Sequence, residues 1–455
     1  MSFNYYPVIR NTKLRLLLIY GLSFLFTACS VQKQIAKSAQ ADLLDTKALQ
    51  AAHVGISIFD PAANKYLYNY QGDKYFVPAS NIKLPTCYAA MKYLGDSLVG
   101  LRWEEKKDNF FIQATADPTF LHPDFPKQPV FNFLKSIDKK IFYTEHFSEF
   151  TGYGNGWSWN DFNEAYMAER SAMPIYNNLI KVQLKTPRFG QLNKKDLEIT
   201  PAYFSNKVTT RYLGNSDINS IVVKRAVDEN IFFAFPQASK VNTEVSVPFK
   251  IFGKGLFVDS LLSDTLHKDV VQFSTFLSHL QNSIHSQPTD SLLKPMMHRS
   301  DNFFAEQSLL MVSNEMLGVM NDEKIIDTIL KTDFRDLPQK PRWADGSGLS
   351  RYNLFTPQDF VFILNKMKNE FGMERLKVIL PTGGEGTISS YYKADSGYIY
   401  GKTGTLSGVV AFSGFLYTKK GKLLIFSTLV NNHQATATEV RRAVEKFLQG
   451  VRNRY

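Results

Sequence analysis

The chain has 455 residues, of which 44% are hydrophobic and 21% charged, so we expect two or three folded domains and no long disordered blocks. Its 53 Lys and Arg residues exceed its 42 Asp and Glu residues, which gives a formal net charge of +11. No run of basic residues is dense enough to indicate nucleic-acid binding, so the charge fits a basic protein that faces an anionic surface.

The first residues are typical of an export signal. Residues 1–15 contain three basic residues and no acidic one, and residues 16–28 are apolar but too short to span a bilayer. The apolar stretch ends at a small residue directly before Cys29, which resembles a bacterial lipoprotein signal. We therefore expect lipidation of Cys29, and membrane contact through this lipid anchor only. The alternative is a plain signal peptide with an incidental cysteine. If Cys29 is lipidated, the other cysteine, Cys87, has no disulfide partner within the chain.

The next segment predicts a tether, two strands and a helix. Residues 29–50 are polar and lead into a short helix, while 52–59 and 65–70 are strands joined by a turn-rich loop. A helix is expected over residues 80–94. Pro85 lies within it and lacks an N–H to donate, so we expect a kink there.

The pattern changes between about residues 98 and 255. Aromatic and β-branched residues alternate with polar ones, and turn residues are frequent. This pattern indicates a separate strand-rich domain inserted into the chain. Its clearest strands are expected at 178–184, 219–225 and 243–251.

Helices and strands alternate in the C-terminal part. Helical periodicity covers 256–284 and 289–318, and Thr356 and Thr436 have the sequence pattern of helix N-caps. Two strands are expected between those caps, at 408–418 and 422–430. The N-terminal strand pair and this C-terminal pair can join into one antiparallel sheet covered by helices.

Three short motifs follow one another along the chain. They are an S-x-x-K motif, an S-D-N motif and a K-T-G motif, at Ser80–Lys83, Ser300–Asn302 and Lys402–Gly404. Each motif alone is weak, because S-x-x-K recurs elsewhere, for example at Ser136 and Lys139. The three together in this order are specific, since this trio marks class A β-lactamases and penicillin-binding proteins.

Ser80 and Lys83 have the spacing of a nucleophile and its base. They are one helical turn apart and share a helix face. A serine hydroxyl needs a base, and a lysine can serve only when it is neutral. Burial and a second cation such as Lys402 both lower a lysine pKa. Taken alone, the pair would be a helix cap and a solvated lysine.

The other two motifs also have structural alternatives. Lys402 is expected on a strand, and an edge strand that carries a cation suits a peptide with a free C-terminal carboxylate. The structural alternative is a lysine that only prevents the sheet edge from pairing with another chain. Gly404 leaves room for a substrate backbone. Ser300 and Asn302 precede a helix and would otherwise be capping residues.

The motifs and their surroundings resemble the penicillin-binding protein 4 family, the low-molecular-mass class C D-alanyl-D-alanine carboxypeptidases and endopeptidases. The resemblance covers about residues 35–450, and the 220 residues from Ser80 to Ser300 leave room for the large insert of this class. Residues 185–245 match only loosely. Further matching segments are Asp117–Thr119, Gly156–Asp161, Asp345–Arg351, Thr356–Pro357 and Leu380–Gly384.

The resemblance implies an α/β fold of the α+β type, the penicillin-binding and serine β-lactamase-like transpeptidase fold. Its antiparallel five-stranded sheet would be flanked by helices, with a large strand-rich insert. The implied divisions are a signal peptide (1–28), a tether with an N-terminal helix (29–50), a discontinuous catalytic domain (51–97 and 256–455) and the insert (98–255).

The resemblance also implies a role for each motif residue. Ser80 would be the nucleophile, Lys83 its general base, and Ser300 the group that passes a proton to the leaving amine. Substrate-binding residues would be Asn302, Lys402, Thr403 and Gly404, and the backbone N–H groups of Ser80 and Thr405 would form the oxyanion hole. No metal and no cofactor is expected.

The implied activity is that of a serine-type D-Ala-D-Ala carboxypeptidase, and also a DD-endopeptidase, acting on peptidoglycan stem peptides during cell wall remodelling. β-Lactams would acylate the same serine. The resemblance places the protein in the periplasm, lipid-anchored, with the outer membrane favoured because Ser30 and not Asp follows Cys29. The oligomeric state is not determined, and a homodimer stays open.

Other functions are less well supported by the sequence. A class A β-lactamase would need an E-x-x-L-N run, a triad hydrolase a G-x-S-x-G motif, and a zinc peptidase an H-x-x-x-H pair, and the sequence contains none of them. A catalytically inactive wall-binding lipoprotein is the remaining alternative, although every motif residue is intact.

Overall fold

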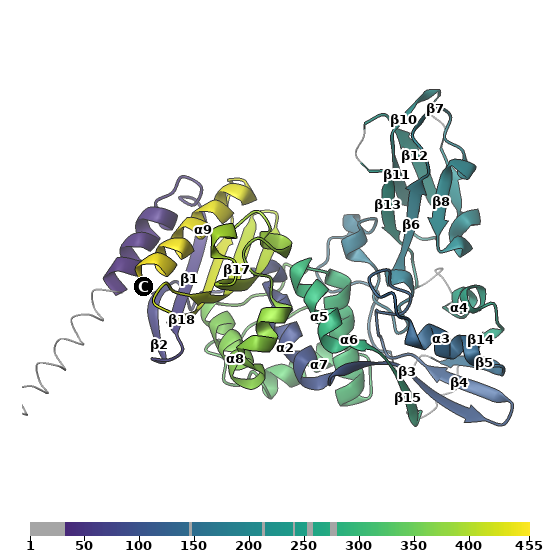
Figure 1. The fold of residues 1–455 in the computed structure, drawn as a ribbon, viewed down its shortest axis with the longest axis horizontal. Helices are drawn as coiled ribbons and strands as arrows, with labels where there is room; N and C mark the ends of the chain where they lie inside the picture. The colour runs from purple at the N-terminus through teal and green to yellow at the C-terminus, as the bar shows by residue number, and fades with distance from the viewer. Residues whose placement is uncertain (1–31, 145–147, 212–213, 240–241, 253–257, 274–279) are drawn as a thin grey trace, which may run out of the picture.

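The computed structural model describes residues 32–144, 148–211, 214–239, 242–252, 258–273 and 280–455 (Figure 1). The export segment and Cys29 lie outside the described residues. Within the described ranges, no helix is both long and apolar enough to cross a membrane.

One five-stranded antiparallel sheet joins the two ends of the chain. Its strand order is β16-β17-β18-β1-β2, so the N-terminal and C-terminal strand pairs do form one sheet, as the sequence predicted. Nearly every residue of β17 and β18 is buried, because helices cover both faces. The strands are β1 (His53–Asp60), β2 (Lys65–Tyr70), β16 (Ile399–Leu406), β17 (Val409–Tyr417) and β18 (Leu423–Asn431).

Alternate residues of this sheet face two different cores. Phe412 and Phe426 pack with α9 (Ala437–Arg454) and the N-terminal helix, which spans 32–39 and continues as η1 (Gln40–Leu44). Phe415 and Ile425 belong to the larger core, which they share with residues of the main helical layer. Figure 1 shows this layer and α9 on opposite sides of the sheet. That layer contains α2 (Lys83–Tyr93), α5 (Thr289–His298), α6 (Asn302–Leu317), α7 (Asp322–Lys331) and α8 (Pro357–Ile379). The predicted caps at Thr356 and Thr436 are confirmed as capping boxes.

Two helix predictions need correction. The helix expected from Ser80 begins as a short 3-10 helix, η2 (Ala79–Ile82), and becomes α-helical only at Lys83. Pro85 therefore lies in the first turn of α2. The N–H groups of a first turn have no carbonyl partner within the helix, so a proline there costs no helical hydrogen bond. The expected kink is wrong. The helix expected over 289–318 is two helices, separated at the S-D-N motif.

The helix expected over 256–284 is also mostly wrong. Among the residues of this range that the structure describes, α4 (Val258–Leu266) is the helical part, and it is followed by β14 (Val270–Gln272) and β15 (Asn282–Pro288). β15 pairs with β3 (Ser97–Lys106), a strand nearly 180 residues earlier in the chain. Tertiary pairing of this kind overrides the weak local preference of a short segment.

The inserted segment forms a second five-stranded sheet and a distal lobe. The sheet has the order β14-β5-β4-β3-β15, with β4 (Asn109–Gln113), β5 (Lys140–Thr144) and the helix α3 (Pro129–Ser136). Because β14 and β15 belong to it, we propose that the insert extends to about residue 288, past the expected boundary at 255.

The distal lobe lies far from the first sheet (Figure 1). It contains the strand groups β13-β6-β8, β11-β12-β9 and β10-β7. Its strands are β6 (Leu179–Leu184), β7 (Arg188–Gly190), β8 (Leu197–Thr200), β9 (Val208–Thr210), β10 (Ser216–Ile218), β11 (Ser220–Arg225), β12 (Phe232–Gln237) and β13 (Glu244–Pro248).

Candidate active site

The turn that carries Ser80 is held tightly against the edge strand β16. The Asn81 side chain donates to Ser413 Oγ on β17 at 2.7 Å. Gly404 on β16 approaches so closely that a Cβ there would lie 2.6 Å from the Pro78 carbonyl oxygen and 3.0 Å from the Ser80 nitrogen. Only glycine fits this contact. The K-T-G motif therefore fixes the position of the Ser80 backbone through its glycine.

Lys83 is fully buried and its ammonium position is fixed by three contacts. Its Nζ lies 3.1 Å from Ser80 Oγ, 2.7 Å from Asn302 Oδ1 and 2.7 Å from the Ser347 carbonyl oxygen. A neutral lysine has two N–H bonds and one lone pair. With the N–H groups donated to Asn302 and Ser347, the lone pair faces the Ser80 hydroxyl.

Burial makes that neutral form more accessible than it is for an exposed lysine. Burial lowers the pKa of Lys83 to about 8, although three nearby carboxylates oppose the shift. At pH 7 about one Lys83 in ten is then neutral. This fraction is sufficient for a general base, because the proton transfer itself needs only a small population in the right geometry.

Ser300 and Lys402 form the second polar pair. Lys402 Nζ donates to Ser300 Oγ at 2.9 Å and to the Thr403 carbonyl at 2.7 Å. Burial holds the pKa of Lys402 well below its usual range, and the nearby Lys83 and Arg441 cations lower it further. Ser300 has a left-handed φ of 63°, which turns it out of the path of α6. The cap of α6 is Asp301, whose side chain accepts the Phe304 N–H at 3.1 Å.

The remaining predicted residues surround the same space. Asn302 is the first residue of α6, and its Nδ2 donates to the Tyr166 carbonyl of the insert at 3.1 Å. On β16, the Thr403 hydroxyl contacts Thr387 Oγ1 at 2.6 Å, and the Thr405 hydroxyl accepts from Arg441 at 2.6 Å. The structure thus brings together the residues of all three motifs, while Cys29 lies outside the described residues.

A cleft of about 780 Å³ opens beside Ser80. Residues of the catalytic domain and of the insert both line this cleft. The three motifs alone did not predict that the insert would form part of its wall. Its lining residues are Ser80, Gly156, Ser158, Asp161, Tyr166, Asn302, Gly348, Leu349, Arg351, Thr405, Leu406 and Ser407. The insert therefore contributes directly to the walls of the site.

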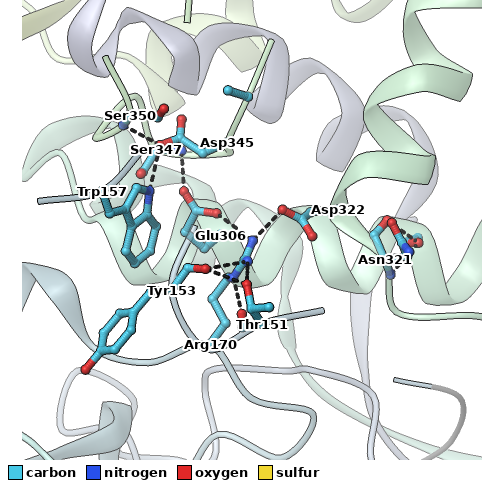
Figure 2. Close-up of polar contacts among 12 residues, drawn as sticks. Thr151, Tyr153, Trp157, Arg170, Glu306, Asn321, Asp322, Asp345, Ser347 and Ser350 are labelled. Atoms are coloured by element: carbon cyan, nitrogen blue, oxygen red, sulfur yellow. Dashed lines mark hydrogen bonds and ion pairs between the residues drawn. The ribbon is translucent and has the colours of Figure 1, made fainter. Parts of the chain in front are cut away.

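Two buried carboxylates near the site were missed by the sequence analysis. Asp345 accepts the backbone N–H groups of Gly348 and Ser350, at 2.8 and 2.6 Å, and Glu306 accepts that of Ser347 at 2.7 Å (Figure 2). The only sequence signal was the Asp345–Arg351 segment, noted for its family resemblance. Glu306 lies in an apolar helix and gave no signal.

The sequence matches a family model and two relatives that are named D-Ala-D-Ala carboxypeptidases. Residues 35–451 match the sequence model of the D-Ala-D-Ala carboxypeptidase 3 (S13) family. A D-alanyl-D-alanine carboxypeptidase from Actinomadura sp. (strain R39) is 25% identical over 444 residues, which cover 87% of this chain and 80% of that protein. The D-alanyl-D-alanine carboxypeptidase DacB of Haemophilus influenzae is 24% identical over 462 residues, covering 90% of this chain and 92% of that protein.

A solved structure shares the fold. The crystal structure of penicillin binding protein 4 from Haemophilus influenzae matches with a TM-score of 0.69 and 21% identity, covering 92% of this chain and 98% of that one. At this identity the match is evidence for the fold. The α+β arrangement predicted from the sequence, a sheet between helices with a large insert, is confirmed.

Proposed function

The chain belongs to the D-Ala-D-Ala carboxypeptidase 3 (S13) family, and from this premise we propose that it cleaves the terminal D-Ala-D-Ala bond of peptidoglycan stem peptides through an acyl-enzyme on Ser80. The observation that carries the proposal is the Lys83 contact set. Two acceptors, Asn302 Oδ1 and the Ser347 carbonyl, hold the lysine so that its free lone pair faces Ser80 Oγ.

Acylation follows from this geometry. Lys83 takes the Ser80 hydroxyl proton as Ser80 Oγ bonds to the carbonyl carbon of the penultimate D-alanine. The negative charge that develops on the carbonyl oxygen is stabilised by the backbone N–H groups of Ser80 and Thr405, both of which line the cleft. The C–N bond then breaks, and Ser300 relays a proton to the leaving amine: it gives up its hydroxyl proton and receives in its place the proton that Lys83 took from Ser80, which returns Lys83 to its neutral form. Lys402 Nζ contacts Ser300 Oγ at 2.9 Å and holds it in place. Water later releases the shortened peptide from Ser80.

Substrate binding is assigned to the edge strand and to α6. The extended peptide would pair with β16. Thr403 would offer a hydroxyl to its C-terminal carboxylate, and that carboxylate would favour the charged form of Lys402 against the effect of burial. Gly404 would contribute by holding this part of β16 beside the Ser80 turn. Asn302 would hold a substrate amide, since its side chain is fixed between Lys83 and the Tyr166 carbonyl.

The test is covalent labelling of the purified protein by benzylpenicillin, followed by intact-mass measurement, beside Ser80→Ala. We expect an adduct of one penicillin on the wild type and none on the variant, together with release of D-alanine from a D-Ala-D-Ala peptide. Penicillin turnover without a lasting adduct would favour a β-lactamase. No adduct on either protein would reject Ser80 as the nucleophile and favour a wall-binding protein.

We further propose an endopeptidase activity and an exported, lipid-anchored location. The cleft of about 780 Å³ is lined by the insert as well as by the motif residues, and hydrolysis of a cross-linked muropeptide dimer tests whether it accepts a cross-linked substrate. We expect lipid on Cys29, with the outer membrane as the favoured location. The mass of the N-terminal peptide and the membrane fraction that contains the protein, measured for the wild type and for Cys29→Ser, test this. Sedimentation of the same sample decides between a monomer and a homodimer.

A further inference from the structure

The loop of residues 345–351 connects Lys83 to the insert. The peptide unit between Ser347 and Gly348 is held at both ends: its carbonyl accepts from Lys83 Nζ at 2.7 Å, and its N–H donates to Asp345 Oδ1 at 2.8 Å. Because a peptide unit is planar, fixing its N–H also fixes the direction of its carbonyl. Asp345 therefore sets where the Lys83 acceptor lies.

The preceding peptide unit, between Gly346 and Ser347, is held in the same manner. Its carbonyl accepts from Thr86 Oγ1 at 2.7 Å, and its N–H donates to Glu306 Oε1 at 2.7 Å. Thr86 lies one turn after Lys83 on α2, so both carbonyls face the same side of that helix. Two successive peptide units are thus fixed between α2 and a pair of carboxylates.

Both carboxylates have a further partner on the insert. Trp157 Nε1 donates to Asp345 Oδ2 at 2.9 Å, and Arg170 Nη1 lies 3.5 Å from Glu306 Oε2 (Figure 2). Arg170 is itself fully buried and also pairs with Asp322 at 2.5 Å. A continuous set of contacts therefore runs from the insert to the Lys83 ammonium.

We infer that the insert orients Lys83 through two positioning residues, Glu306 and Asp345. The inference rests on the proposed role of Lys83 as the base for Ser80. It assigns the insert a part in acylation beyond lining the cleft. Through Asp345 and Glu306, the side chains of Trp157 and Arg170 keep the Ser347 carbonyl where it can accept one Lys83 N–H.

The same residues influence the charge of Lys83. Burial raises the pKa of Glu306 to about 7, so this carboxyl group changes charge around neutral pH. Its ionised form raises the pKa of Lys83, and its neutral form does not. The other charged groups that face these two residues are Asp345, Asp301, Asp322, Arg170 and Lys402.

The first test compares two tryptophans of one motif. Trp157→Phe keeps a ring beside Arg170 but removes the N–H that Asp345 accepts, whereas Trp159 is 77% exposed and its Phe variant is the matched control. The rate of adduct formation with benzylpenicillin is followed by intact mass. We expect Trp157→Phe to slow acylation about 10-fold and Trp159→Phe to change it less than about 2-fold, because small displacements of a base cost rate steeply. Equal rates for the two variants would overturn the inference.

The second test separates the hydrogen bond of Glu306 from its charge. Glu306→Gln keeps an acceptor for the Ser347 N–H, and Arg170 keeps Asp322 as its partner, so the fold should persist. We expect near-normal acylation at pH 8 and a shift of the acidic limb of the pH–rate profile to lower pH. Glu306→Ala should show the same shift of the acidic limb and should also lose about 10-fold in rate at pH 8, where Glu306→Gln is near normal.

The outcomes separate the inference from the proposed function. If the wild type forms no adduct, the proposed function fails. If the wild type reacts and the Glu306 variants match it in rate and in pH profile, the inference fails while the function stands. Thermal unfolding of each variant shows whether it is folded. If either Glu306 variant is unfolded, the comparison of Trp157→Phe with Trp159→Phe decides whether the insert orients Lys83.

Discussion

The pH dependence of acylation is the most direct measure of the Lys83 mechanism. Only neutral Lys83 can accept the Ser80 proton, and burial lowers its pKa to about 8. The neutral fraction is then about 1% at pH 6, 10% at pH 7 and 50% at pH 8. The second-order rate constant for acylation should therefore rise by up to about 50-fold between pH 6 and pH 8 and level off above pH 9. Protonation of Glu306 below its pKa of about 7 lowers the pKa of Lys83 and makes the rise smaller than this limit.

The assay is stopped-flow or quenched mass analysis of benzylpenicillin labelling across this pH range, with circular dichroism at each pH to show that the fold is unchanged. Ser80→Ala is the blank. An ordinary exposed lysine would place the midpoint near pH 10.4, so the rate would still be rising steeply above pH 9. That result would refute the lowering of the Lys83 pKa by burial, and a rate independent of pH from 6 to 9 would refute neutral Lys83 as the base.

Three further predictions concern the neighbourhood of the site. Asp301→Asn keeps the α6 cap but removes a negative charge that raises the pKa of Lys83, so the acylation midpoint should move to lower pH with little change in melting temperature. Gly404→Ala should slow acylation about 100-fold in a folded protein, because its Cβ would lie 2.6 Å from the Pro78 oxygen and displace Ser80; a normal labelling rate would contradict the close contact. Cys87 is fully buried and burial raises the pKa of its thiol, so a maleimide should label it only after urea unfolding, and rapid labelling of the native protein would disprove this.

Local sequence patterns determined much of this molecule. The alternation of apolar residues predicted β1, β2, β17 and β18, and the Thr356 and Thr436 caps predicted the starts of α8 and α9. The three motifs also pointed to residues that the fold brings together around one cleft. These features were readable because propensity, caps and motif spacing are properties of neighbouring residues.

The tertiary structure alone decided the rest. Residues 282–288 are a strand because β3 offers a partner, and Pro85 is harmless because α2 starts at Lys83. Glu306 is 41 residues from Ser347 in sequence and gained its role only when α6 packed beside that loop. The pKa of Lys83 likewise depends on burial and on carboxylates from distant segments. Contacts and desolvation of this kind arise from packing between remote parts of the chain, which no local pattern encodes.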